Sequence, residues 1–319
     1  MSQNSSVFVK IWGTRGSIPT PGPLTRCYGG NTSCYELRFG DAIFICDAGS
    51  GIRELGNDLV TRGTTPLTAH LFLSHTHWDH VQGFPFFAPA YLPSSKIIVY
   101  DKSPIDSKFF RMLSGQMDGD YFPINFSDLK ASITSDHLAD GKREIAGVQV
   151  ATFDQQHPGG SLGFAFSYAG VKVVYATDNE IDQLIVGDGR SNGSSVARTI
   201  ARAQVDFVRD ADLLIADGQY REDEYAAHTG WGHPSILTLV DLAAQANVKC
   251  LAVTHHDPDR SDKDVDALID QARGRADALG SSVQVYAARE GVELKLTPQR
   301  STIVPSPKKT AASRRANSR

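Results

Sequence analysis

The segment Ser74-His75-Thr76-His77-Trp78-Asp79-His80 contains three imidazoles and one carboxylate within six positions, and it follows the mostly apolar run 70–73. A strand that ends in a metal-binding loop has this form. Histidine nitrogen and aspartate oxygen together suit Zn²⁺ or a similar divalent ion. Neighbouring residues cannot all reach one ion without strain, whereas a tight turn presents alternate residues to two ions. The segment therefore predicts a two-metal site rather than a surface loop that is rich in histidine by chance.

Three further candidate ligands each follow an apolar, strand-like run. They are His157 after 148–153, Asp178 after 171–177, and His255 after 250–254. A single histidine after a strand is more often a hydrogen-bonded structural residue than a ligand. Four such strand ends in one chain favour a shared site, because loops at strand ends are where folds of this type assemble their binding and catalytic groups.

In their order along the chain, these residues resemble the five motifs of the metallo-β-lactamase superfamily: Asp47-Ala48-Gly49, His75 to His80, His157, Asp178 and His255. The segments 12–20 and Gly230-Trp231-Gly232-His233 resemble the ribonuclease Z and phosphodiesterase branch of that superfamily. The match covers roughly residues 7 to 297. It implies an α+β fold of the αββα sandwich type: two mixed, mostly antiparallel sheets face to face, with helices outside. It also implies hydrolysis at a dinuclear metal centre.

The resemblance also implies which residue binds which ion. The first ion would be held by His75, His77 and His157, the second by Asp79, His80 and His255, with Asp178 bridging them. His256 is the alternative to His255, which we prefer because it comes directly off the strand.

Two more positions bear on the metal site. Asp47 is expected to orient a ligand imidazole rather than to bind metal itself. Related flavin-linked di-iron redox proteins carry Glu at the position of His77, so the histidine favours hydrolysis over electron transfer. Zn²⁺ is the first expectation for both ions, with Mn²⁺ or Fe²⁺ as alternatives that this ligand set also accepts.

The expected chemistry follows from the charges of two adjacent cations. They lower the pKa of a bridging water from near 16 to about 7, so that a hydroxide nucleophile is available at neutral pH. The leaving alkoxide of a phosphate ester then needs a proton. His233 is the candidate general acid, and Asp217 would orient it; Asp79 joins them in the catalytic set as a ligand of the second ion. Helix capping beside Pro234 is the alternative role for His233. The family often has His before this Asp, whereas this chain has Ala216.

Length and composition agree with the single metallo-hydrolase domain that the resemblance implies, residues 1–300, and with a disordered tail, residues 301–319. The chain has 319 residues, is 41% hydrophobic and carries a formal net charge of −4. The tail contains five basic residues and no acid, and its Pro-, Ser- and Ala-rich composition is typical of disorder. The four cysteines form no C-x-x-C pair, so idle thiols in a reducing cytoplasm are expected. We expect neither a signal segment nor a membrane span.

Periodicity predicts a series of strands and two clear helices. The strands are expected at 7–12, 33–38, 42–46, 69–73, 96–100, 148–153, 163–168, 171–176, 213–216, 249–254, 283–287 and 293–296. The helices are expected at 235–246 and 262–279, with Ser235 and Ser261 or Asp262 as amino-terminal caps and Gly280 as a stop. Residues 187–195 are expected to form a mobile loop.

A short spacing favours a small substrate. Ribonuclease Z proteins that trim transfer RNA usually carry a long arm between the third-motif His and the fourth-motif Asp, whereas only 21 positions separate His157 from Asp178 here. The acidic body also lacks the positive surface that grips long nucleic acid, so no stable nucleic-acid partner is expected. The resulting expectation is a phosphodiesterase acting on a small phosphodiester, with a 3′,5′-cyclic nucleotide as first guess. The resemblance adds a homodimer as an expected assembly.

Candidate substrate-binding residues complete the prediction. Arg15 is a candidate for bidentate phosphate contact, with a structural salt bridge as its alternative. Asn31 is a second candidate, with a turn as its alternative. Residues 108–113 with Met117, Tyr121 and Phe122 form either a lid whose aromatic rings stack on a purine or an ordinary core cover. A ribonuclease Z-like endonuclease, a thioester or lactone hydrolase, and a nucleotide sensor remain alternative functions.

Overall fold

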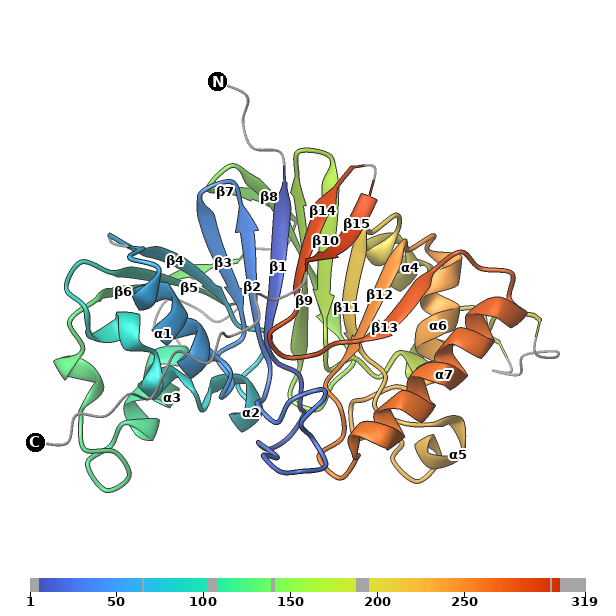
Figure 1. Ribbon diagram of the computed structural model, residues 1–319, viewed down its shortest axis with the longest axis horizontal. Helices are drawn as coiled ribbons and strands as arrows, with labels where there is room; N and C mark the ends of the chain where they lie inside the picture. Colours follow the sequence, from blue (N-terminus) through green and yellow to red (C-terminus); the bar gives the residue numbers. More distant parts are fainter. Residues whose placement is uncertain are drawn as a thin grey trace, which may run out of the picture.

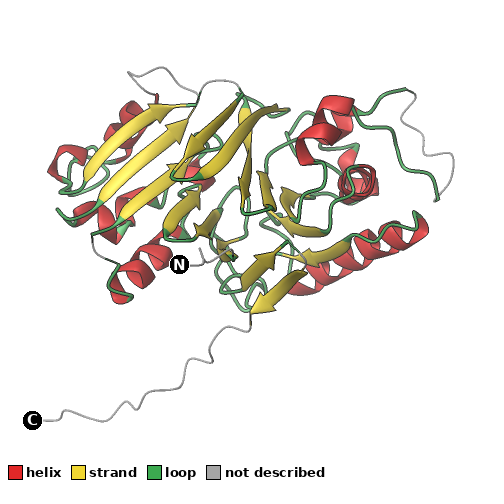
Figure 2. Ribbon diagram, turned by 90° about the horizontal axis from the view of Figure 1, so that it is seen from above, coloured by secondary structure: helices red, strands yellow, loops and turns green. Residues whose placement is uncertain are grey.

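The protein is built from two β-sheets that pack face to face, with helices on both outer faces (Figures 1 and 2). The computed structural model describes residues 6–64, 66–101, 108–138, 141–187, 195–298 and 300–304. The expected αββα sandwich of the metallo-β-lactamase type is confirmed.

The first sheet has the strand order β15-β14-β1-β2-β3-β4-β5-β6. Its strands are β1 (Val7–Gly13), β2 (Cys34–Phe39), β3 (Ala42–Cys46), β4 (Thr68–Phe72), β5 (Lys96–Asp101), β6 (Ser132–His137), β14 (Glu293–Thr297) and β15 (Arg300–Val304). The second sheet has the order β13-β12-β11-β10-β9-β8-β7. Its strands are β7 (Lys142–Ile145), β8 (Val148–Gln155), β9 (Ser161–Tyr168), β10 (Val171–Ala176), β11 (Leu213–Asp217), β12 (Cys250–Thr254) and β13 (Gln284–Ala287).

Both sheets are mixed. Parallel pairing runs from β3 to β6 in the first sheet and from β10 to β13 in the second, and the other pairings are antiparallel. The parallel share is thus larger than a mostly antiparallel pattern implies. Parallel strands end at the same edge, which matters for the site because the candidate ligands follow strand ends.

Helices and short 3-10 turns connect the strands. They are α1 (Ile52–Thr61), α2 (Trp78–Val81), η1 (Phe84–Phe86), η2 (Ala88–Tyr91), α3 (Lys108–Gln116), η3 (Phe126–Asp128), η4 (Ile181–Leu184), α4 (Arg202–Val208), α5 (Glu222–Tyr225), α6 (Ile236–Gln245) and α7 (Asp262–Ala278). The two predicted helices are confirmed as α6 and α7, and the side chains of Ser235 and Ser261 accept the expected capping bonds from Thr238 N and Asp264 N. Gly280 ends α7 with a φ of 62°, a left-handed conformation that costs glycine little.

The core has three layers, which follow from the alternation of side chains along each strand. Inward-facing residues of both sheets, such as Val9, Phe44, Phe166 and Ile215, form the central layer. The outer face of the second sheet packs on α4, α6 and α7, and that of the first packs on α1 and on residues around α3. Among the described residues, no helix has the length and apolar character needed to cross a bilayer.

Three strands and one boundary differ from the sequence prediction. β6 is largely polar and half exposed, and β7 is largely polar and mostly exposed, so they lack the apolar runs by which strands are recognised. Residues 301–304, assigned to the tail, pair with β14 as part of β15. The tail boundary at 301 is thereby corrected. The rest of that predicted tail and most of the predicted loop 187–195 lie outside the described residues.

Candidate dinuclear metal centre

Five strand ends converge at one edge of the sandwich. Strands β3, β4, β8, β10 and β12 lead into Asp47, the 74–80 loop, His157, Asp178 and His255 respectively. Three of these residues have positive φ angles: 61° at Asp47, 62° at Asp178 and 54° at His255. Non-glycine residues adopt this conformation rarely, and it persists where surrounding structure holds it, often at functional sites. The chain therefore turns sharply at these positions.

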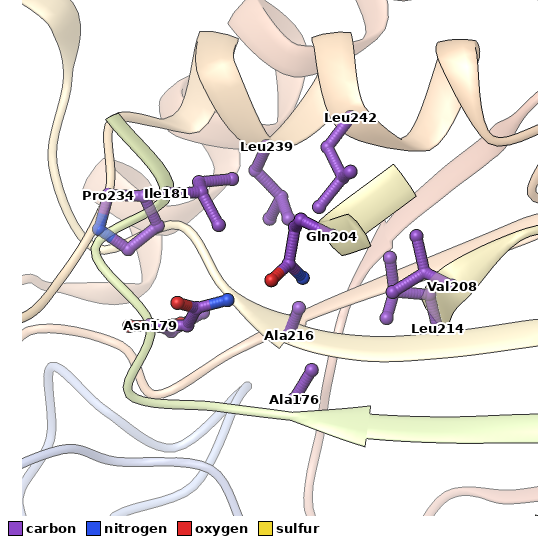
Figure 3. A pocket seen from close by; sticks show the side chains of 11 residues that line it. Ala176, Asn179, Ile181, Gln204, Val208, Leu214, Ala216, Pro234, Leu239 and Leu242 are labelled. Atoms are coloured by element: carbon purple, nitrogen blue, oxygen red, sulfur yellow. The ribbon is translucent and has the colours of Figure 1, made fainter. Parts of the chain in front are cut away.

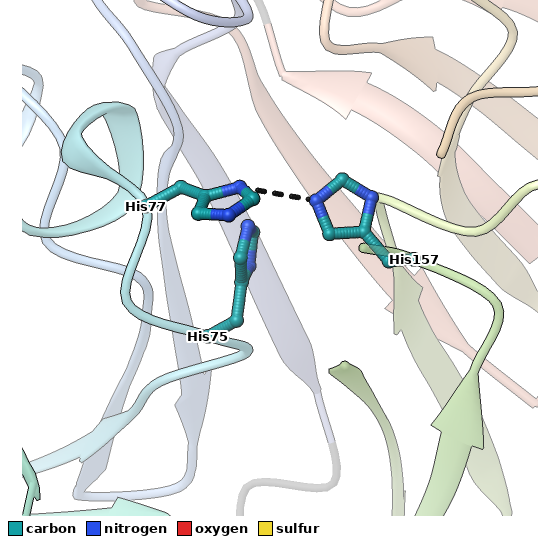
Figure 4. Close-up of side chains that lie close together, drawn as sticks. All are labelled: His75, His77 and His157. Carbon is teal, nitrogen blue, oxygen red and sulfur yellow. Dashed lines mark hydrogen bonds between the residues drawn. The ribbon is translucent and has the colours of Figure 1, made fainter. Parts of the chain in front are cut away.

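His75, His77 and His157 form the first potential metal-binding group, and their candidate ligand atoms all lie within 4.8 Å of one another (Figure 4). His77 Nδ1 lies 3.1 Å from His157 Nε2. The side chains of His75 and His157 are nearly inaccessible, at 5% and 3% exposure, whereas His77 is exposed. The structure thus brings together the three residues expected to hold the first ion, with His77 on the solvent side.

Asp79, His80 and His255 form the second such group. Asp79 Oδ2 lies 3.2 Å from His80 Nε2 and 3.0 Å from His255 Nε2. The carboxylate of Asp178 lies between the groups: Oδ1 is 3.9 Å from His75 Nε2 and 3.4 Å from His255 Nε2, and Oδ2 is 3.2 Å from His80 Nε2. This is the position expected of a bridging carboxylate.

Four of the five imidazoles are held by their outer nitrogen, so that Nε2 points to the centre. The Nδ1 partners are Ser74 Oγ for His75, Asp47 Oδ2 for His80, Gly232 O for His157 and Gln219 Oε1 for His255. A fixed outer bond sets the tautomer and the ring orientation of a metal-binding histidine. These supporting groups come from segments far apart in the sequence, and Gln219 was not anticipated.

Asp47 has the orienting position that the sequence predicts for it. Its carboxylate is fully buried and accepts hydrogen bonds from Ser74 N, Ser74 Oγ, His80 Nδ1 and the Tyr175 hydroxyl, at 2.6 to 2.8 Å. Three of these four bonds therefore fix the 74–80 loop or its histidine, and the fourth ties the carboxylate to β10.

The donor set fits divalent cations. His75 Nε2 and Asp178 Oδ2 are buried and have no hydrogen-bond partner, although orphaned buried polar atoms are costly. Burial lowers the pKa of His75, His77 and His157, which favours the neutral imidazole that binds metal. Burial also acts on His255, but Asp178 and Asp79 outweigh it and raise its pKa to about 9. A proton on His255 thus offsets the excess negative charge of the carboxylates when no cation is present. A bound cation would offset this charge instead.

His255, rather than His256, faces the centre. His256 is buried, its Nε2 lies 3.1 Å from Ala288 O, and its ring packs against Tyr28. Burial lowers the pKa of His256 to about 3, so the ring is neutral and belongs to the core. The preference for the residue directly off the strand is consistent with this geometry.

His233 and Asp217 lie beside the metal-binding groups. His233 Nδ1 is 2.8 Å from Asp217 Oδ2 and 4.0 Å from Asp178 Oδ1, and its ring stacks on His255 with centroids 4.8 Å apart. Ser235, not His233, is the amino-terminal cap of α6, so the capping alternative is wrong. The imidazole is thus held at Nδ1 by Asp217, and its ring lies against His255.

A small cavity adjoins Asp217 on the side of α4 and α6 (Figure 3). Its volume is about 10 Å³, Ala216 lines it, and the amide of Gln204 lies among its apolar walls. Gln204 is 1% exposed, and neither its amide atoms nor Asp217 Oδ1 has a hydrogen-bond partner. Asp217 thus holds His233 through one oxygen, and Ala216, the residue before it, lines the cavity.

Glu180 fixes the segment that carries His233, and the sequence analysis missed it. Its buried carboxylate accepts bonds from Gly230 N, Gly232 N and the Tyr225 hydroxyl at 2.7 to 2.9 Å. Burial raises the pKa of Glu180, but these hydrogen bonds outweigh it and the net pKa is lowered. The sequence feature that could have pointed to Glu180 is its position two residues after Asp178.

The amino-terminal loop closes another side of the site. Ser17, with a φ of 63°, donates its backbone N–H to Asp79 Oδ2 at 2.7 Å. A side-chain carbon at Gly16 would lie 2.3 Å from the His255 ring. The loop resembling the ribonuclease Z branch therefore acts through its backbone, which packs directly on two candidate ligands.

The structure corrects the prediction for Arg15. Its side chain is fully buried, and its guanidinium donates to the carbonyls of Gly29, Asp257 and Arg260 at 2.8 to 3.2 Å. It ties loops together and cannot meet a phosphate. The Asn31 amide donates to Glu290 and accepts from Ser50, and its contact with substrate remains a prediction.

Comparison with known proteins agrees with this architecture. A family model described as a beta-lactamase superfamily domain matches residues 43–256, more than half of the chain. Ribonuclease Z of Haloarcula marismortui is 23% identical over 315 residues, which cover 89% of this chain and 95% of that protein.

Solved structures show the same fold. The metallo-beta-lactamase fold protein YhfI of Bacillus subtilis has a TM-score of 0.65 at 18% identity and covers 92% of this chain and all of its own. Yeast PDE1 has a TM-score of 0.61 at 15% identity, with 92% of this chain and all of that chain covered. From the matched family model, the fold and the assembled motif residues, the chain belongs to the metallo-β-lactamase superfamily of metal-dependent hydrolases.

Proposed function

We propose that this protein is a metal-dependent phosphodiesterase that hydrolyses a small phosphodiester, with a 3′,5′-cyclic mononucleotide as its first candidate substrate. The observation that carries the proposal is the His233–Asp217 pair beside the metal-binding groups. An alkoxide is a poor leaving group and needs a proton donor at this place, whereas an activated ester, lactone or thioester does not.

The chain's own residues divide the work. His75, His77 and His157 would hold one ion, and Asp79, His80 and His255 the other, with Asp178 between them. When bound, two divalent ions supply an activated water and neutralise charge on the phosphoryl oxygens. His233 donates a proton from Nε2 to the leaving oxygen. Asp217, at Nδ1, orients the ring and stabilises its charged form.

The size of the substrate is argued from the segment between the third and fourth motifs. Residues 157–178 consist of β9, a tight turn at Ala169 and Gly170, and β10. Every residue of this segment is described, and none forms an arm that could grip transfer RNA. This supports a small phosphodiester over a folded RNA.

An RNA endonuclease is the second candidate, because the curated relatives are named ribonuclease Z. Transfer RNA cleavage would need a binding surface other than the missing arm. Precursor transfer RNA therefore belongs in the first assay, together with a cyclic mononucleotide, a cyclic dinucleotide, a 2′,3′-cyclic phosphate, a lactone and a thioester. Metal content should be measured on the same sample.

Variants test the roles of the residues. His77→Ala and Asp178→Ala are expected to abolish turnover and lower metal content while the far-ultraviolet circular dichroism spectrum is kept. His233→Ala is expected to slow cleavage of an alkoxide-leaving substrate by about 10²-fold and to spare a p-nitrophenyl ester. His228→Ala is the matched control, because His228 hydrogen-bonds Glu224 O and stacks on Tyr220. Equal losses of His233→Ala on both substrates would remove it from the acid role.

A further inference from the structure

A second hollow opens beside the metal-binding loop. It has a volume of about 630 Å³, and the residues that line it include Thr76, Trp78, Gln82, Phe86, Gln116 and Tyr121. We call it the aromatic pocket. Its volume lies within the range of pockets that bind small ligands. Thr76 and Trp78 flank His77 in the sequence, and His77 is the exposed member of the first metal-binding group. The pocket therefore adjoins the loop that carries His77.

Its large aromatic side chains are left uncovered. Tyr121 is 83% exposed, Trp78 67% and Phe86 54%. The Phe86 ring is steadied edge-on by Phe122, with centroids 5.4 Å apart and an interplanar angle of 89°. Leu113 and Met117, by contrast, turn into the core. The core-cover alternative thus holds for Leu113 and Met117, whereas Tyr121 of the same segment is exposed and lines the hollow, so its stacking on a base stays a prediction.

The chemistry of the walls restricts the ligand. Among the described residues that line the pocket, none carries a charge. Gln116 lines the pocket, and its Oε1 is buried and has no hydrogen-bond partner, so the amide must rotate before this oxygen can accept from a donor on a ligand. Exposed ring faces stack on planar groups. The walls favour a flat, neutral group with an N–H donor, and they offer no counterion for a second phosphate.

We propose that the aromatic pocket binds the nucleobase of a cyclic mononucleotide whose phosphodiester lies at the metal centre. The inference rests on the proposed function and narrows its substrate class. A purine has flat faces that can stack on the exposed rings and ring-edge donors that can bond the unpartnered acceptor of the pocket. Its sugar phosphate would extend past His77. A cyclic dinucleotide would place its second phosphate against uncharged walls.

The test compares a 3′,5′-cyclic purine mononucleotide with ribose 3′,5′-cyclic phosphate, which has no base. Trp78→Ala, Tyr121→Ala and Gln116→Leu are expected to raise KM for the nucleotide about tenfold or more, with smaller changes in kcat. KM for the base-free substrate is expected to stay within twofold. Phe8→Ala is the control, since Phe8 is an aromatic residue near the far end of β1, beneath Arg38 and Lys295.

A binding measurement separates the pocket from catalysis. Adenosine, which has no phosphate, is expected to quench tryptophan fluorescence of the wild type and not of Trp78→Ala. Quenching without hydrolysis of any phosphodiester would sustain the pocket and defeat the proposed function. Hydrolysis with KM unchanged in all three variants would defeat the pocket alone. Loss of a dimer in Trp78→Ala and Tyr121→Ala, seen by sedimentation with unchanged KM, would show that the rings form an interface between copies, which also overturns the proposal.

Discussion

Replacement of Asp47 by Asn tests whether orientation of one imidazole decides metal binding. Asp47 accepts four hydrogen bonds at a fully buried position. The amide keeps the volume but turns one acceptor oxygen into a donor, so that at least one buried donor, such as Ser74 N–H or His80 Nδ1–H, loses its partner. An unsatisfied buried group costs about 1–3 kcal/mol of unfolding free energy.

The effect on the metal is expected to be larger at one ion than at the other. His80 belongs to the second group, and loss of such a supporting contact lowers metal affinity about 10- to 100-fold, or roughly 1.4–2.7 kcal/mol. Competition with a chromophoric chelator measures the two affinities. We expect Asp47→Asn to lower the affinity for the ion at the second group by this factor and the affinity for the other ion by much less.

A matched variant separates this effect from general destabilisation. Asp212 is also buried, and it accepts bonds from Lys172 N and Lys249 Nζ at the opposite end of β11 from Asp217. Asp212→Asn is expected to lower stability in chemical denaturation and to leave both metal affinities unchanged. Wild-type affinity for both ions in Asp47→Asn, or equal weakening in both variants, would refute the orienting role.

Three further changes probe other parts of the structure. Burial raises the pKa of Asp182 to about 6, against about 3.9 in the unfolded chain, so the stability that its protonated carboxyl contributes is present below pH 4 and lost as pH rises through 6. The unfolding free energy of Asp182→Asn should therefore rise by up to ~3 kcal/mol relative to that of wild type between pH 4 and pH 8. A difference in unfolding free energy that does not change with pH would contradict this. Gly16→Ala would place Cβ 2.3 Å from the His255 ring, and we expect at least a tenfold loss of turnover and of metal affinity, whereas Gly22→Ala, with open space around it, should behave as wild type. Gln204→Leu replaces an unpartnered buried amide with an apolar group of similar size and should raise stability by about 1 kcal/mol; destabilisation in thermal melts would instead show that the amide is satisfied by bound water.

Much of the site could be predicted because ligands follow strand ends, and strand ends can be recognised from apolar runs. The 74–80 loop, Asp178 and His255 are of this kind. What the sequence could not supply is contact between distant segments. Arg15 had the right residue type in the right loop, but only the fold shows that carbonyls from 257 and 260 enclose its guanidinium. Glu180 and Gln219 act through backbone amides or a ring nitrogen, which leave no pattern. The strands β6 and β7 are polar, so periodicity did not reveal them.

The candidate ligands are divided between the two sheets: four come from the loop after β4, and three follow β8, β10 and β12. Bound ions would consequently clamp one layer of the sandwich to the other. An expanded state that kept its strands but lost the packing between layers could not retain either cation. During acid or denaturant titration, cation release should then coincide with loss of the near-ultraviolet aromatic signal and precede loss of the far-ultraviolet one, so that occupancy would report on tertiary assembly.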